Sequence, residues 1–254
     1  MLSAILPAEI FSLLLVFVRV GGAIMMMPGI GDPYVSPRIR LLFALLLAII
    51  VTPVVAPILP PLPGSAVSLV LLVLGEVIIG LFLGGLARLL MAALTTAGMV
   101  IAYMSSLANA LVDDPSAAQQ GSIAGSFLAL VALLTIFTLD LHHMLLRGIV
   151  DSYELFLPGE ALPAGDMAAL VARVVSQSFL LSFQIAAPFV AVGLVFYLGI
   201  GLLSRLMPQV QVFFVALPLQ VTAGLAVLFF ALPVAIAWFL QHFEGTMRPF
   251  TAGG

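Results

Sequence analysis

Three ionisable residues, Arg19, Glu76 and Arg88, stand inside long apolar runs where charge is expensive. A charged side chain at the centre of a membrane-spanning helix costs about 2.5 kcal/mol or more, so such a residue is a candidate for function. If one helix carried both Glu76 and Arg88, they would lie about 18 Å apart and could not pair directly. Each therefore needs another partner, a lipid headgroup or water. Ion translocation and packing within an assembly both stay open as their role.

The segment from residue 104 to 122 is the main polar interruption of the apolar pattern. It contains two adjacent carboxylates, Asp113 and Asp114, followed by Pro115. Proline disfavours helical geometry at the residue before it, so a helix is not expected to continue through Asp114. Irregular backbone at membrane depth is tolerated only where protein buries it or where it lines a water-filled cavity. The segment is therefore either a pore loop or plug, or an ordinary loop outside the bilayer.

Asp140, His142 and His143 could suggest a metal site or a proton relay, but their spacing argues against one. Neighbouring residues on a helix point about 100° apart, so the two histidines are not expected to face one ion. The end of a helix near the membrane surface is the simpler interpretation. The chain has no cysteine and no G-x-S-x-G motif. We therefore expect no metal, no cofactor and no enzymatic activity.

The elements that must position these residues are apolar helices. Of the 254 residues, 63% are hydrophobic and only 7% are charged, against about 45–50% apolar and about 25% charged in an ordinary soluble domain. Lipid or neighbouring membrane subunits can cover such an exterior, whereas water cannot. The net charge of −3, with no basic stripe, gives no support to nucleic acid as a partner. The composition predicts an all-α, polytopic membrane protein with lipid around it.

About six apolar segments are long enough to cross a bilayer, which requires roughly 20 residues. We expect a single membrane domain over residues 1–254, with the helices arranged as hairpins, a polar loop at 104–122 and a polar linker at 151–166. Pro188, Pro218 and Pro233 lie inside the last two segments and predict kinks or breaks. The six segments are approximately residues 7–27, 39–56, 65–103, 121–149, 167–206 and 211–243.

Gly80 and Gly84 form a small-x-x-x-small pattern in the third apolar segment. Small residues at this spacing let two membrane helices approach closely. The pattern therefore predicts helix packing rather than chemical activity.

Landmarks along the chain, taken in their order and spacing, resemble a known family. Near the N-terminus these are Arg19, Pro28 and the run Ser36-Pro37-Arg38. The middle of the chain has the run from Val112 to Ser116, with one extra Asp before its Asp-Pro pair. Before and within the last apolar segment stand Arg205, Pro208, Gln209 and Phe213. The pattern is similar to that of the FliR family of flagellar biosynthesis proteins, the R-type or T-type subunits of the type III secretion export gate.

This resemblance implies a non-enzymatic subunit in the bacterial inner membrane, at the flagellar basal body. The expected partners are the P-type and Q-type export-gate subunits, other export-apparatus membrane proteins, and unfolded exported proteins in transit. The resemblance also implies a channel plug, in which Leu111 and Val112 are apolar stoppers and Asp113, Asp114, Pro115 and Ser116 direct the course of the loop. Residues expected to pack against other subunits are Gly80, Gly84, Arg205, Pro208, Gln209 and Phe213.

Two other functions compete with this interpretation. In a secondary transporter of a small solute or ion, broken helices and Glu76 would form the substrate or proton site. The sequence shows no convincing internal repeat, which counts against a transporter. An intramembrane enzyme would need a nucleophile, a base or a metal constellation, and we recognise none. The family landmarks fit a flagellar system better than a virulence system, but they do not distinguish the two with certainty.

Overall fold

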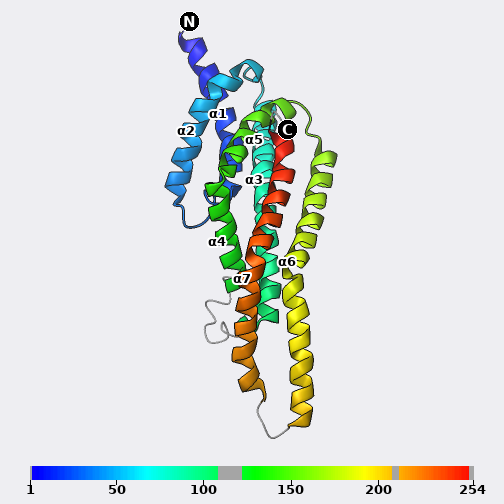
Figure 1. The fold of residues 1–254 in the computed structure, drawn as a ribbon. Helices are drawn as coiled ribbons and strands as arrows, with labels where there is room; N and C mark the ends of the chain where they lie inside the picture. Colours follow the sequence, from blue (N-terminus) through cyan, green and yellow to red (C-terminus); the bar gives the residue numbers. More distant parts are fainter. Residues whose placement is uncertain (1, 108–121, 208–211, 252–254) are drawn as a thin grey trace. The chain divides into compact units, whose positions relative to one another are not determined.

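The chain is mainly helical in the part that the computed structural model describes, residues 2–107, 122–207 and 212–251 (Figure 1). No strand occurs among these residues, so the predicted all-α class is confirmed. The 3-10 helices η1 (Ala56–Ile58) and η4 (Arg248–Phe250) are short additions to the main helices. The α-helices are α1 (Leu2–Met26), α2 (Pro37–Val55), α3 (Ala66–Met104), α4 (Ile123–Thr138), α5 (Leu141–Leu155), α6 (Ala164–Leu206) and α7 (Val212–Met247).

The number of membrane-spanning segments agrees with the sequence. Within the described ranges five helices are long and apolar enough to cross a membrane, and a sixth span results if α4 and α5 count together. The expected polytopic membrane protein of about six apolar helices is therefore confirmed.

The fourth apolar segment, predicted as one helix over 121–149, is broken in two. Helices α4 and α5 are bent by 75° at the break, where Asp140 adopts a left-handed conformation with φ 58° and ψ 16°. A left-handed residue cannot continue a right-handed helix. By contrast, the helices continue on both sides of Pro188, Pro218 and Pro233. The linker expected over 151–166 is shorter, because α5 extends to Leu155 and α6 begins at Ala164.

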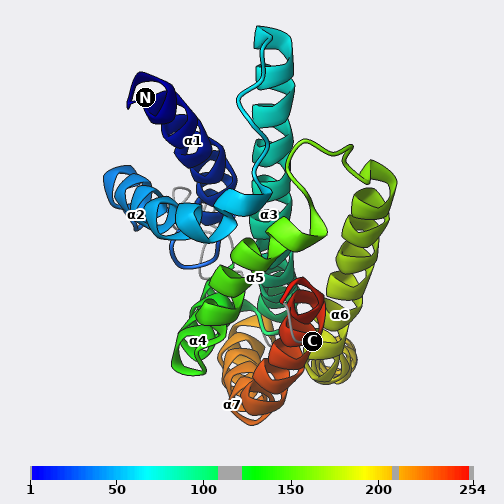
Figure 2. The same cartoon turned by 90° about the horizontal axis from the view of Figure 1, so that it is seen from above.

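The chain divides into two compact units. The first unit contains the described residues up to 89, residues 136–174 and those from 243 onward. Its helices α1 and α2 lie side by side as a hairpin (Figures 1 and 2). Val20 of α1, Ala48 of α2 and Tyr153 of α5 belong to one buried cluster at its centre.

The loop of residues 27–36 joins α1 to α2. The Asp32 carboxylate accepts hydrogen bonds from the Gly29 backbone N–H at 2.8 Å and from the Tyr34 hydroxyl at 2.9 Å. Gly29 has a φ of 86°, which glycine adopts at no steric cost. Partial burial, together with the bond and charge of Asp32, raises the pKa of Tyr34 to about 12. The phenol is protonated at physiological pH, as a tyrosine with an ordinary pKa also is, and can donate this hydrogen bond.

The second unit contains residues 90–135 and 175–242, apart from those outside the described ranges. Here α6 and α7 lie side by side (Figures 1 and 2). Polar side chains on both helices bind backbone carbonyls of α3: Ser182 Oγ donates to Ala93 O, and Gln220 Nε2 donates to Met104 O, each at 2.8 Å. These bonds attach α6 and α7 to the C-terminal part of α3.

In both units, glycines let the backbones of neighbouring helices come into direct contact. In the first unit, a Cβ added to Gly80 would lie 2.2 Å from the Arg19 carbonyl oxygen, and one added to Gly84 would lie 2.3 Å from that of Ala23. In the second unit, a Cβ on Gly98 would lie 2.1 Å from the Gly125 Cα. Each of these separations is shorter than a Cβ can tolerate, so the backbones pack directly against one another.

We expect Gly80→Ala to lower the free energy of unfolding by about 1–3 kcal/mol, because overpacking a tight contact forces backbone shifts. The measurement is equilibrium unfolding of the purified protein in mild detergent. Gly85→Ala is the matched control, since a Cβ there meets nothing within 4 Å. It should be neutral or slightly stabilising, because alanine favours helix over glycine. Equal stability of the two variants would contradict the close α1–α3 packing.

Candidate functional site

An ion pair between Arg19 of α1 and Glu76 of α3 is the central feature of the first unit. Arg19 Nε lies 2.5 Å from Glu76 Oε2, and Arg19 Nη2 lies 2.9 Å from Glu76 Oε1. The two side chains are only 0% and 2% exposed. The paired contacts form the bidentate arrangement in which a guanidinium binds a carboxylate most strongly.

Helix α5 completes the surroundings of Arg19. Arg19 Nη1 donates to Ser152 Oγ at 3.3 Å, and Nη2 also donates to the Phe156 carbonyl at 2.9 Å. The guanidinium carbon lies 3.8 Å from the centre of the Tyr153 ring, which is a cation–π contact. Residues from α1, α3 and the end of α5 therefore meet around one buried charge.

The sequence around Glu76 explains how its carboxylate reaches α1. Gly80 lies one helical turn after Glu76 and contacts the Arg19 backbone without an intervening side chain. Residues four apart share one face of a helix, so the carboxylate and the glycine both face α1. Gly84 repeats the contact one turn further on, against Ala23. The small-residue pattern therefore serves packing within this chain, beside the ion pair.

The role of this site is to hold helices together. Both Glu76 carboxylate oxygens accept from Arg19, and the guanidinium is shared with Ser152 and the Phe156 carbonyl. Burying a charge without such partners is very costly, and removing one partner of a buried pair typically destabilises by about 3–5 kcal/mol. The arrangement is suited to holding three helices together.

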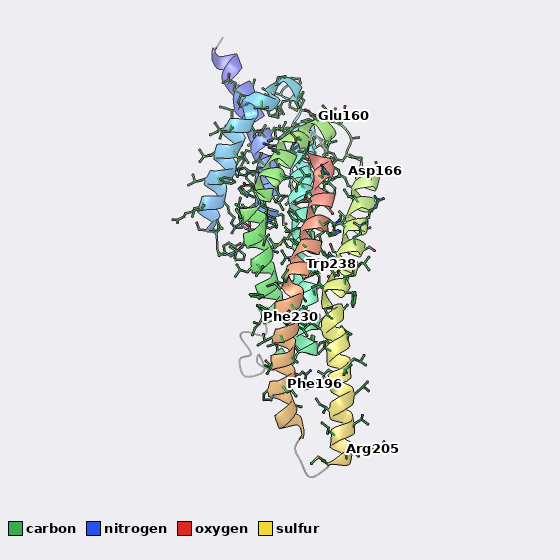
Figure 3. The ribbon with its side chains drawn as sticks, viewed as in Figure 1. Glu160, Asp166, Phe196, Arg205, Phe230 and Trp238 are labelled. Atoms are coloured by element: carbon green, nitrogen blue, oxygen red, sulfur yellow. The ribbon has the colours of Figure 1, made fainter. Side chains whose placement is uncertain are left out.

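The other residues singled out in the sequence lie elsewhere. Arg88 is exposed on α3 and takes no part in the pair. Arg205 is exposed in the last turn of α6, where Figure 3 labels it. Phe213 belongs to the first turn of α7. Residues outside the described ranges are Leu111, Val112, Asp113, Asp114, Pro115, Ser116, Pro208 and Gln209.

Sequence reasoning identified Arg19 and Glu76 separately but not as partners. The signal was available, because opposite charges isolated in two apolar runs each require compensation. The contributions of Ser152, Tyr153 and the Phe156 carbonyl had no such signal. Serine and tyrosine are ordinary in a helix of mixed polarity such as α5, and a backbone carbonyl cannot be singled out from sequence.

His142 and His143 lie closer together than their spacing on a helix led us to expect. Asp140, His142 and His143 each offer a ligand atom, and these atoms lie within 4.8 Å of one another. Both histidines belong to the first turn of α5, so their Cα–Cβ directions differ by about 100° as expected, and the close approach comes from their side chains. In the structure α5 begins only at Leu141, after the left-handed Asp140, and the two imidazole ring centres lie 4.1 Å apart.

Sequence comparison relates this chain to bacterial export proteins. The family of bacterial export proteins, family 1, matches residues 10–246, a range that includes Arg19 and Glu76. The flagellar biosynthetic protein FliR of Caulobacter vibrioides is 42% identical over 231 residues, covering 91% of this chain and 92% of that protein. FliR of Bacillus subtilis is 32% identical over a match that covers 87% of this chain and 86% of that protein. Yop proteins translocation protein T of Yersinia pestis is 27% identical over a match that covers 61% of this chain and 60% of that protein.

A double-mutant cycle tests the ion pair. We expect Arg19→Met to lower the free energy of unfolding by about 3–5 kcal/mol, because it leaves the Glu76 carboxylate buried without its partner. The double variant Arg19→Met with Glu76→Leu should recover much of this loss, since no uncompensated charge remains. Detergent unfolding of the single and double variants gives the coupling energy. Arg88→Met is the control at an exposed arginine, and additive effects of the Arg19 and Glu76 changes would rule out the coupling.

Proposed function

This chain belongs to the bacterial export protein family that includes the flagellar biosynthetic protein FliR, and we propose that it is a non-enzymatic subunit of the flagellar type III protein export gate. The observation that carries the proposal is the match over residues 10–246 together with 42% identity to a FliR protein along nearly the full length of both chains. The long apolar helices support a membrane location, and the proposed location is the inner membrane at the flagellar basal body.

The proposed partners are P-type and Q-type subunits, which together with this chain would form a pore for unfolded flagellar proteins. Support comes from the apolar exteriors of the two units taken separately. In the first, Leu46 and Ile50 of α2 are exposed; in the second, Leu198 of α6 and Phe230 of α7 are exposed, Phe230 to 77% (Figure 3). Contiguous apolar surface of this kind requires lipid or another subunit.

The segment Leu111–Ser116 is the proposed plug of the closed channel. A closed pore needs an apolar constriction that excludes water and ions, and Leu111 and Val112 supply apolar side chains for it. The described residues that flank the segment are well attached within the second unit. Met104 O accepts from Gln220, and Ser122 Oγ donates to the Gly98 carbonyl at 2.8 Å. Firm attachment on both sides is what a plug needs to return to one closed position.

The alternative of a secondary transporter gains no support from Glu76. A proton or substrate site requires a carboxylate that can exchange its partner, whereas both Glu76 oxygens are bound by a buried arginine of the same chain. Under the export-gate proposal this pair holds helices together, and its loss impairs assembly.

Deletion of Leu111–Ser116 tests the plug. We expect cells carrying the deletion to leak ions and small solutes, because the closed channel has lost its constriction. The measurement is membrane conductance or solute uptake at matched protein levels. The paired substitution Leu111→Ser with Val112→Ser keeps the loop length and should leak as well. Conductance equal to that of the wild type in both variants would remove the plug from the proposal.

Co-purification tests the assembly independently of the plug. Full-length protein extracted in mild detergent should retain the P-type and Q-type subunits in a stable complex. Arg19→Met should reduce the yield of this complex several-fold, because the first unit loses its internal support, while the double variant Arg19→Met with Glu76→Leu should restore much of it. A wild-type protein that purifies without either partner would contradict the proposed gate.

A further inference from the structure

The break between α4 and α5 brings together three side chains to which the proposed function assigns no role. Asp140 and His143 are exposed, with side chains 77% and 63% accessible, and Asp140 Oδ1 lies 3.5 Å from His143 Nδ1. His142 lies beside them, its ring centre 4.1 Å from that of His143. All three belong to the first unit. The arrangement offers one carboxylate and two imidazoles over a small volume.

The conformation of Asp140 is unusual for its position. Aspartate before a helix ordinarily caps the first turn with its side chain, but no side-chain cap bond forms from Asp140 to α5. Its left-handed backbone is also less favourable than a helical or extended one for a residue with a Cβ. The carboxylate is instead directed toward His143. The Asp140 side chain therefore belongs to the histidine cluster and does not cap α5.

His142 is held in place by packing. Its ring stacks on Phe137 at a centroid distance of 4.8 Å and an interplanar angle of 16°. Its Nδ1 atom is buried and has no hydrogen-bond partner among the described residues. A fixed ring with an unsatisfied nitrogen is prepared for a ligand that the protein itself does not supply.

The separations suit a transition-metal ion. Zinc binds imidazole nitrogen and carboxylate oxygen at about 2.0–2.2 Å, so tetrahedral ligand atoms stand about 3.3–3.6 Å apart. The pair Asp140 and His143 is already at 3.5 Å, and the ligand atoms of all three residues lie within 4.8 Å of one another. Small side-chain rotations of the two exposed residues close the remaining difference.

We propose that Asp140, His142 and His143 form a binding site for one divalent transition-metal ion of the zinc, cobalt or nickel class. Two imidazoles favour these ions over calcium and magnesium, which prefer oxygen ligands. Three protein ligands leave at least one position for water or for a group from another molecule. The ion would join Asp140, before α5, to the first turn of that helix. The proposal concerns this chain alone and does not depend on the export gate.

Cobalt binding to the purified full-length protein tests the proposal. The protein carries an affinity tag without histidine, and Co²⁺ is titrated in detergent while its visible absorption is recorded. We expect one equivalent to bind with the stronger absorption of a low-coordinate site, and Zn²⁺ to displace it. His142→Ala and His143→Ala should each weaken binding at least tenfold. Asp140→Gly should do the same while retaining the positive φ, which glycine tolerates.

His242→Ala is the matched control, because His242 is the third of the three histidines in the chain and lies outside the cluster. It should bind cobalt as the wild type does. Circular dichroism and size-exclusion profiles establish that each variant is folded. The proposal is overturned if the wild type shows no saturable binding, if the double variant His142→Ala with His143→Ala retains it, or if His242→Ala loses it as completely as the cluster variants.

Discussion

The first unit depends on one interaction, the buried pair of Arg19 and Glu76. A charge removed from water is tolerated only where its hydrogen-bonding groups are matched, and here the match requires residues from α1, α3 and α5. Moving α3 by one residue would rotate Glu76 by about 100° away from Arg19. Leucine and valine on the same faces would accept many such registers. We infer that the pair selects a single helix register more than it adds stability.

Close glycine contacts provide the packing that the ion pair requires. In a bilayer, lipid tails are as apolar as the helices, so association relies on van der Waals packing and interhelical hydrogen bonds. Gly80 lets the α3 backbone reach the carbonyl of Arg19 itself. The second unit follows the same packing principle, since Gly98 meets Gly125 and Gln220 binds the Met104 carbonyl. Backbone proximity and one specific polar contact occur together in each unit.

Much of this fold could be predicted, because the length of an apolar segment shows whether a helix can cross a bilayer. The break at Asp140 could not be predicted, since aspartate usually precedes a helix without turning left-handed. Pro188 predicted a kink or a break, and the helix continues on both sides of it. Pro188 shows that a missing backbone donor does not by itself end a membrane helix. For the site, isolated charge identified Arg19 and Glu76. Their pairing, across 57 positions of sequence, required knowledge of which helix faces meet.

Several buried polar groups form hydrogen bonds within the chain, so other molecules meet mainly the apolar outward side chains. Arg19, Glu76, Ser182 and Gln220 are buried, and the hydrogen bonds described above for them lie within the chain. The outward faces of α2, α6 and α7 carry mainly leucine, valine and phenylalanine. Charge complementarity can therefore contribute little on these faces, and shape and dispersion must select the neighbour. A protein built in this way exchanges lipid for a partner subunit at small desolvation cost, which suits a membrane component that must enter a larger assembly.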